Sequence, residues 1–206
     1  MNRPDRTGFV PNRAAEHEPF FLTGDTEADS LLETDRLALL VGMVLDQQVP
    51  IEWAFAAPAK LRARLGEHWG VREIAAMAPD DLLEVFVAKP ALHRYPAAMA
   101  KRIHALCQAL AEGYDADVEA LWRDADAASF VRRVRRLPGF GEEKTRIFLA
   151  LLAKKFAVRP AGWEQACAPF GDDQPRTAAD IHDPASLAAV RAWKKAMRAQ
   201  GRSKSD

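Results

Sequence analysis

The chain has 206 residues, of which 49% are hydrophobic and 28% charged, the composition of a globular protein that can bury a sizeable core. Its 29 basic and 29 acidic residues balance, so net charge does not indicate a nucleic-acid partner, and only the distribution of charge can. Two cysteines are too few for a four-cysteine zinc or iron–sulfur site. No apolar run reaches the roughly 20 residues that span a bilayer, so we expect a cytoplasmic protein without a membrane partner.

The two ends of the chain are polar, whereas the middle is rich in apolar residues with helical spacing. We expect a flexible N-terminus over residues 1–18, one helical domain over 19–200 and a flexible tail over 201–206. Residues 37–45 are apolar nearly all round, which predicts a buried central helix. That helix should end at Val49, because proline at the next position disfavours helical geometry in the residue before it.

Helical periodicity continues along the rest of the chain, and the alternation typical of strands is nearly absent. The last predicted helix carries Lys194, Lys195 and Arg198 on its polar side. A stretch over 159–184, rich in Pro, Gly, Asp and Ala, predicts a long loop. The sequence therefore predicts an all-α protein. Its further helices are expected at 51–65, 71–77, 79–87, 96–113, 130–136, 142–156 and 187–197.

A glycine-containing turn joins two of these helices, over Leu137-Pro-Gly-Phe-Gly141. Proline stops the first helix, and we expect both glycines to adopt backbone angles closed to other residues. The unpaired amides that begin the next helix, beside the positive end of its dipole, suit a phosphate group. Residues 130–146 also hold six basic and two acidic side chains. A plain helix–helix turn with a solvated basic face is the alternative, but the combination favours DNA binding.

This turn, followed by an apolar helix, resembles the helix-hairpin-helix of the endonuclease III, adenine glycosylase and alkyl-base glycosylase superfamily, the HhH-GPD proteins. The resemblance covers roughly residues 37–156, with the hairpin region at 130–156. It implies a DNA glycosylase-like fold of two helical lobes with a central cleft, acting as a monomer on double-stranded DNA. The residues expected to contact DNA from this region are Arg136, Gly139, Phe140, Gly141 and Lys144.

Two upstream segments support the resemblance. Residues 44–49 are similar to the family segment that ends the helix bearing a DNA-probing glutamine; Gln48 would enter the gap left by a flipped base, with Gln47 beside it. Residues 92–95 stand where the family places a loop that wedges into the opposite strand, which implies Tyr95 as the wedge and His93 as the second candidate. Taken alone, the glutamines also suit a helix cap and the tyrosine a packing position. The five tryptophans are expected in the core.

Cleavage of an N-glycosidic bond passes through a cationic sugar, so the site needs a carboxylate and a pocket for the extruded base. Bifunctional members of the family add a lysine nucleophile two residues after the second hairpin glycine, where this chain has Glu143. Lys144 follows one residue later, about 100° further around the helix. We expect it to point at a phosphate or solvent, and we expect no lyase chemistry.

The family's catalytic aspartate is expected near residues 161–163, where this chain has no aspartate. Three carboxylates remain as candidates. Asp172 or Asp173 could reach the site on an inserted loop, or Glu143 could itself stand at the mouth of the pocket. Glu142 and Glu143 equally suit the helix dipole alone. No cofactor is expected, since the iron–sulfur cysteines are missing; the resemblance allows a monovalent cation at the hairpin.

These expectations together predict a nucleoid-associated base-excision repair protein, a monofunctional glycosylase that flips a damaged or mismatched base. One alternative is a protein of the same fold that recognises damaged or bent DNA without cutting it. A helical interaction module with no DNA role is the third.

Overall fold

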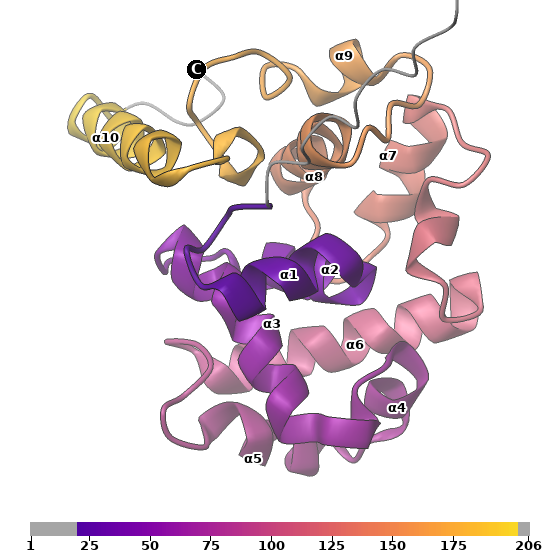
Figure 1. The fold of residues 1–206 in the computed structure, drawn as a ribbon. Helices are drawn as coiled ribbons and strands as arrows, with labels where there is room; N and C mark the ends of the chain where they lie inside the picture. Colours follow the sequence, from indigo (N-terminus) through magenta and orange to yellow (C-terminus); the bar gives the residue numbers. More distant parts are fainter. Residues whose placement is uncertain (1–19, 202–206) are drawn as a thin grey trace, which may run out of the picture.

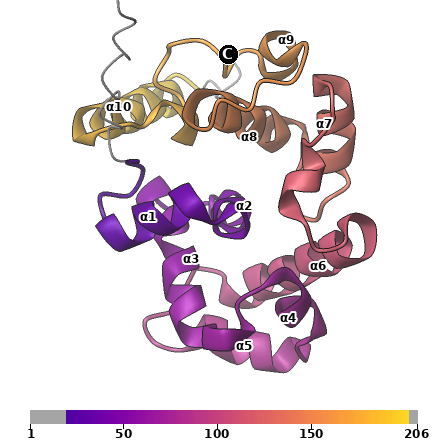
Figure 2. The same cartoon turned by 45° about the vertical axis from the view of Figure 1, so that its right-hand side comes forward.

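A computed structural model describes residues 20–201 (Figure 1). The predicted flexible N-terminus, and the predicted tail apart from Gly201, lie outside the described residues. Between 20 and 201 the chain forms α-helices and short 3-10 helices without a strand, which confirms the all-α prediction. The helices form two groups, the two lobes, which Figures 1 and 2 show one above the other.

The first lobe is built around α2, in which every residue from Leu37 to Leu45 is buried, as its sequence predicts. Gly42 lets α3 approach α2 closely, because a Cβ there would lie 2.6 Å from a ring carbon of Phe55. Helix α1 was not predicted from the sequence; its first amides are capped by the carboxylate of Asp25. The lobe comprises α1 (Thr26–Thr34), α2 (Arg36–Leu45), α3 (Ile51–Leu65), η1 (Gly66–His68), α4 (Val71–Ala76), α5 (Pro79–Val87) and α6 (Pro96–Tyr114).

The second lobe surrounds α8, which is buried from Ile147 to Ala153. The long loop predicted over 159–184 contains the short helix α9 and one 3-10 turn. Buried side chains from Leu22 to Val190 form one hydrophobic cluster, so both lobes share a core. The lobe comprises η2 (Val118–Leu121), α7 (Ala127–Arg135), α8 (Glu142–Lys155), α9 (Trp163–Cys167), η3 (Ala178–Asp180) and α10 (Pro184–Ala199).

The end of α2 corrects one prediction, because the helix stops at Leu45 and not at Val49. The chain leaves helical geometry before the proline: Gln48 has a φ of 58°, in the left-handed region. The amide of Gln47 donates to the Leu45 carbonyl and closes a tight turn. Gln47 and Gln48 therefore lie in a turn between α2 and α3, the glutamine turn, which comprises residues 46–50.

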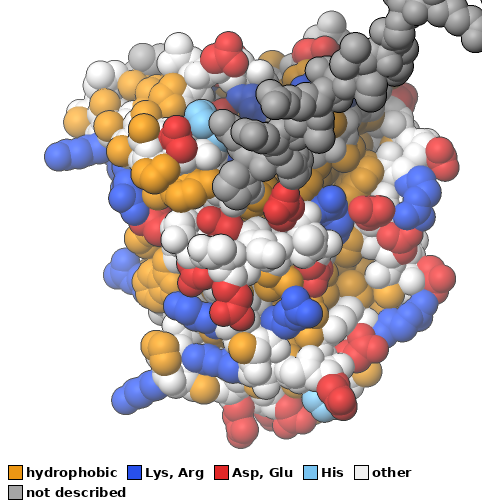
Figure 3. Space-filling view, in the orientation of Figure 1, with side chains coloured by type: hydrophobic (Ala, Val, Ile, Leu, Met, Phe, Trp, Pro, Cys, Tyr) orange, Lys and Arg blue, Asp and Glu red, His pale blue; other side chains and the backbone are white. Residues whose placement is uncertain are grey.

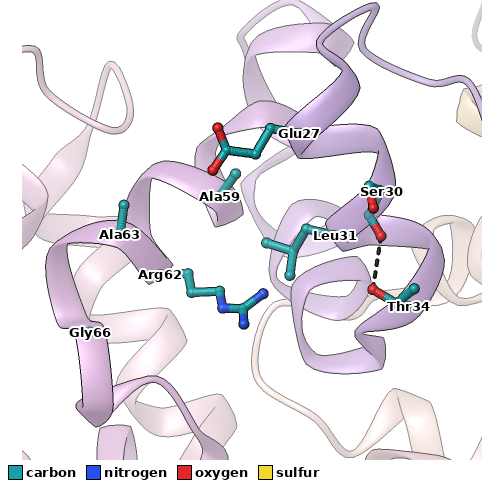
Figure 4. Close-up of a pocket in the computed structure, with 8 residues that line it drawn as sticks. All are labelled: Glu27, Ser30, Leu31, Thr34, Ala59, Arg62, Ala63 and Gly66. Carbon is teal, nitrogen blue, oxygen red and sulfur yellow. Dashed lines mark hydrogen bonds between the residues drawn. The ribbon is translucent and has the colours of Figure 1, made fainter.

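Hollows lie at several places on the described surface. One of about 540 Å³ lies between the glutamine turn and α10, where the two lobes meet. Another, of about 490 Å³, lies between α1 and α3, with Arg62 extending into it (Figure 4). None of the residues predicted to bind DNA lines the α1–α3 hollow, whereas Gln48 lines the hollow beside α10.

Candidate nucleic-acid interface

The hairpin between α7 and α8 is anchored by two buried apolar side chains. Leu137 is 3% exposed and Phe140 5%, and the Phe140 ring lies 5.8 Å from the ring of Phe148 in α8. These contacts fix the turn to the second lobe. The side chain of Phe140 belongs to the core and is not accessible to a ligand. This placement fits a hairpin that contacts DNA through backbone groups.

The two hairpin glycines are needed for different reasons. Gly139 has a φ of +90°, and a Cβ there would lie 3.2 Å from a methyl carbon of Val44 in α2. Both the backbone angle and the close approach therefore require glycine. Gly141 has a φ of −88°, which any residue adopts, so the expectation of an unusual backbone angle is wrong for this glycine. A Cβ on Gly141 would meet nothing within 4 Å, so its face of the hairpin is open.

The first turn of α8 begins directly after Gly141, and no side chain caps its amide groups. Glu142 and Glu143 are exposed in this turn, and Glu142 forms an ion pair with Arg146. Their charges lie at the positive end of the helix dipole, as the sequence predicts. The open amides and the exposed Glu143 carboxylate stand next to each other at the hairpin.

Lys144 lies further around the same turn and faces the first lobe. Its Nζ donates a hydrogen bond of 3.2 Å to the carbonyl of Val44, near the C-terminus of α2. That carbonyl also accepts from the Gln47 side chain, at 2.5 Å. The sequence predicted a lysine pointing at a phosphate or solvent. Instead the lysine joins the lobes, because the last carbonyls of α2 have no intrahelical donors.

The two side chains of the glutamine turn differ: that of Gln47 is hydrogen-bonded within the protein, whereas Gln48 lies at the surface. Gln47 is held on three sides: beyond its bond to α2, its side-chain oxygen accepts from Arg102 in α6 and its carbonyl accepts from His93. Gln48 is exposed, and its side-chain oxygen accepts from the hydroxyl of Tyr95 at 3.3 Å. Of the pair, Gln48 is therefore the side chain available to DNA, and Gln47 supports the turn.

His93 connects the glutamine turn to the loop before α6 through two hydrogen bonds. It is 1% exposed, its Nε2–H donates to the Gln47 carbonyl at 3.1 Å, and its Nδ1 accepts the Tyr95 amide at 3.0 Å. These two bonds suit the neutral ring. Burial lowers the pKa of His93, and the nearby charges of Lys144 and Arg102 lower it further. A ring enclosed in this way is not available as a wedge, whereas Tyr95 is 41% exposed.

Trp53, at the start of α3, extends this exposed surface. It is 37% exposed, and its ring lies 6.5 Å from His93, which lies 6.1 Å from Tyr95. Among the described residues, the exposed large hydrophobic side chains are Trp53, Val87 and Tyr95, so two of them flank the glutamine turn. The expectation that the tryptophans lie in the core is wrong for this one, and the other four are only partly buried.

The basic residues around the hairpin are only partly available to a ligand. Arg133 donates to the carbonyls of Ala120 and Arg123, which ties α7 to the preceding loop. Arg136 is exposed at the C-terminal end of α7, beside the hairpin. The exposed positive charge is therefore smaller than the local sequence suggests.

The carboxylates proposed from the sequence do not lie together. Asp172 forms an ion pair of 2.8 Å with Arg176, and its carbonyl accepts from Lys154 near the C-terminus of α8. Asp173 is exposed next to it. Lys154 lies about 16 Å along the helix from Glu143, at 1.5 Å per residue. Of the candidates, only Glu143 lies at the hairpin.

Both cysteines are buried, and burial raises the pKa of the Cys107 thiol to about 12. That environment suits a packing residue and not a nucleophile. Among the described helices, none is both long and apolar enough to cross a membrane.

An all-helical fold in two lobes, joined by a Leu-Pro-Gly-Phe-Gly hairpin that packs on α2, defines a helix-hairpin-helix protein. Comparison with protein-family models matches residues 41–204 to the HhH-GPD superfamily of base excision DNA repair proteins. The match covers most of the chain, which therefore belongs to this superfamily. Membership implies DNA binding and a DNA-repair glycosylase-like function, and the two cysteines agree with a member that lacks the iron–sulfur ligands. Searches of the curated proteins and of the solved structures gave no match.

Proposed function

We propose that the protein is a monofunctional DNA glycosylase, which extrudes a damaged or mismatched base from double-stranded DNA and hydrolyses its N-glycosidic bond. The observation that carries this proposal is the joining of three segments, distant in the sequence, into one exposed surface. Lys144 from the hairpin bonds to the end of α2, His93 bonds to Gln47, and Tyr95 bonds to Gln48. A hairpin that suits phosphates thus lies beside polar and aromatic side chains that suit an opened base pair.

In this proposal the hairpin holds the DNA backbone. A phosphate would accept hydrogen bonds from the uncapped amides at the start of α8, where the helix dipole favours negative charge. The missing side chain at Gly141 leaves room for the backbone to approach. Arg136, exposed beside the hairpin, would contact a neighbouring phosphate. A monovalent cation at the hairpin carbonyls is compatible with this role.

The glutamine turn and the aromatic side chains would hold the duplex open. Gln48 would fill the space left by the flipped base, because its amide carries both donors and acceptors for base edges. Tyr95 and Trp53 would stack on bases that lose their neighbours, since an exposed ring offers a flat apolar surface. The protein would act as a monomer and without a cofactor, on DNA of the nucleoid.

Glu143 is the carboxylate that we assign to the chemistry. As the bond between the base and the sugar carbon C1′ breaks, its electron pair leaves with the base and positive charge develops on the sugar. The Glu143 carboxylate would stabilise that charge and accept a proton from the water that adds to C1′. The bond from Lys144 to the Val44 carbonyl supports the monofunctional assignment, because it engages the amine that a lyase would use as its nucleophile.

A panel of duplexes, each with one damaged or mismatched base, tests the proposal. We expect strand cleavage only after alkali treatment of the products, and no covalent adduct in the presence of borohydride. Glu143→Gln should abolish base release. Glu142→Gln is the matched control, because it removes the same charge from the same turn of α8 and should retain activity.

The other outcomes assign other functions. An adduct that depends on Lys144 would contradict the monofunctional chemistry. Tight binding to damaged duplexes without base release across the panel would identify a damage-binding protein of the same fold. If no duplex is bound in a salt-dependent way, the helical interaction module remains.

A further inference from the structure

The hollow between the glutamine turn and α10 is lined by more basic than acidic side chains. Its walls come from the start of the first lobe's α3 and from one face of α10. The lining residues are Gln48, Val49, Pro50, Ile51, Glu52, Arg191, Lys194, Lys195 and Arg198. Four cations therefore face one carboxylate in a protein whose basic and acidic residues otherwise balance. Figure 3 shows Lys and Arg side chains projecting on the left of the view, around the position of α10.

The four cations lie on one face of α10 because of their spacing along the helix. Arg191, Lys194, Lys195 and Arg198 follow the three- and four-residue spacing that brings side chains to one face. Nearer the start of the helix, Leu187 and Val190 are buried against the core. We call the four residues the cationic face of α10. Like charges at this spacing repel each other, so the helix bears a cost that a bound anion would offset.

One contact attaches the cationic face to the first lobe. Arg191 forms an ion pair with Glu52, the only carboxylate among the described residues that line the hollow. The side chain of Glu52 is 26% exposed and that of Arg191 56%. Lys195 and Arg198 lie further along α10 and are exposed. Glu52 therefore acts as a positioning residue, which holds α10 across from Gln48 and leaves the outer cations accessible.

We propose that the cationic face of α10 is a second phosphate-binding element, which holds the DNA backbone on the α10 side of Gln48. The inference rests on the DNA binding proposed above. The face spans about 10 Å from Arg191 to Arg198, at 1.5 Å per residue. Over that length a duplex presents about six phosphates, at one charge per 1.7 Å. Gln48 lines the same hollow, so a duplex probed by this side chain brings its backbone close to α10.

Salt-dependent binding tests the inference with a pair of charge-matched variants. The test variant combines Lys195→Gln with Arg198→Gln. The control combines Arg62→Gln with Lys101→Gln, which also removes two exposed cations but from other hollows of the surface. Binding of a fluorescent duplex that contains an abasic-site analogue is measured over a range of salt concentrations. We expect the slope of log affinity against log salt to become shallower by about 1 to 2 in the test variant only.

Acetylation of surface lysines, followed by mass spectrometry, gives a second measurement on the unmodified protein. The duplex should protect Lys195 from acetylation and leave Lys101 reactive. A wild-type protein that binds duplex, together with an unchanged slope in the test variant and an unprotected Lys195, overturns the role of α10 and leaves the proposed function intact. If the wild-type protein itself shows no salt-dependent binding, both fail.

Discussion

At its first turn α8 presents Glu142 and Glu143 to solvent, whereas at its last turn Lys154 and Lys155 turn inward. Both ends place charges that suit the helix dipole. At the C-terminal end the charges are enclosed: Lys154 pairs with Asp180 at 2.5 Å, and burial lowers the pKa of Lys155 to about 8. One end of the helix thus encloses its charged groups within the protein, while the other places uncapped amides and exposed carboxylates at the surface.

The largest effect on stability should come from the enclosed end. The side chain of Asp180 is 7% exposed and accepts hydrogen bonds from Lys154, Thr177 and the amide of Arg176. Asp180→Ala should lower the free energy of unfolding by about 3 kcal/mol, because it leaves a partly buried lysine without its carboxylate partner. Urea denaturation measures the change. The control Asp172→Ala, at a more exposed carboxylate, should alter stability by less than about 0.5 kcal/mol.

The two hairpin glycines differ in a similar way within a single turn, because Gly139 is enclosed and Gly141 is open. Gly139→Ala should cost about 1 to 2 kcal/mol, because its backbone is left-handed and the new methyl group would press on Val44. Gly141→Ala should change stability by less than about 0.5 kcal/mol, since the added Cβ meets nothing. Its effect should appear instead in duplex affinity, with a loss of about tenfold, or 1.4 kcal/mol.

Thermal unfolding and fluorescence anisotropy with a labelled duplex separate the two variants. If Gly141→Ala binds every duplex as tightly as the wild-type protein, the hairpin does not hold the DNA backbone. Equal losses of stability in both variants would mean that the open face of Gly141 is closed in solution.

The sequence predicted most of the helices because apolar periodicity and proline positions are local signals, and α3 and α5 begin and end where they were expected. It did not predict the pairing of residues distant in the chain. Nothing local indicates that Lys144 would bond to Val44, or that Arg102 would hold Gln47. The exposure of the Trp53 side chain could not be predicted from the sequence either, because an aromatic residue near a helix start suits both core and surface.

A smaller effect is expected from His93, which joins the glutamine turn to the loop before α6. In the folded protein, burial of the ring holds the pKa of His93 below the ordinary value of 6.5. As the pH falls below about 6.5, His93 binds a proton more readily in the unfolded chain than in the folded protein. The free energy of unfolding therefore decreases. Urea midpoints at pH 7.5 and pH 5.5 measure this loss. His93→Gln should show a weaker dependence over the same interval, and an identical dependence would place its origin elsewhere.

The smallest change in stability should come from Glu143, although it is the residue to which we assign the chemistry. Its side chain is exposed in the first turn of α8, where removal of one charge alters the free energy of unfolding by less than about 0.5 kcal/mol. Glu143→Gln should therefore unfold with the wild-type midpoint in urea. An unchanged midpoint combined with lost base release would separate a chemical role from a structural one. A large drop in the midpoint would instead place Glu143 with the enclosed charges at the other end of α8, as a residue that the fold itself requires.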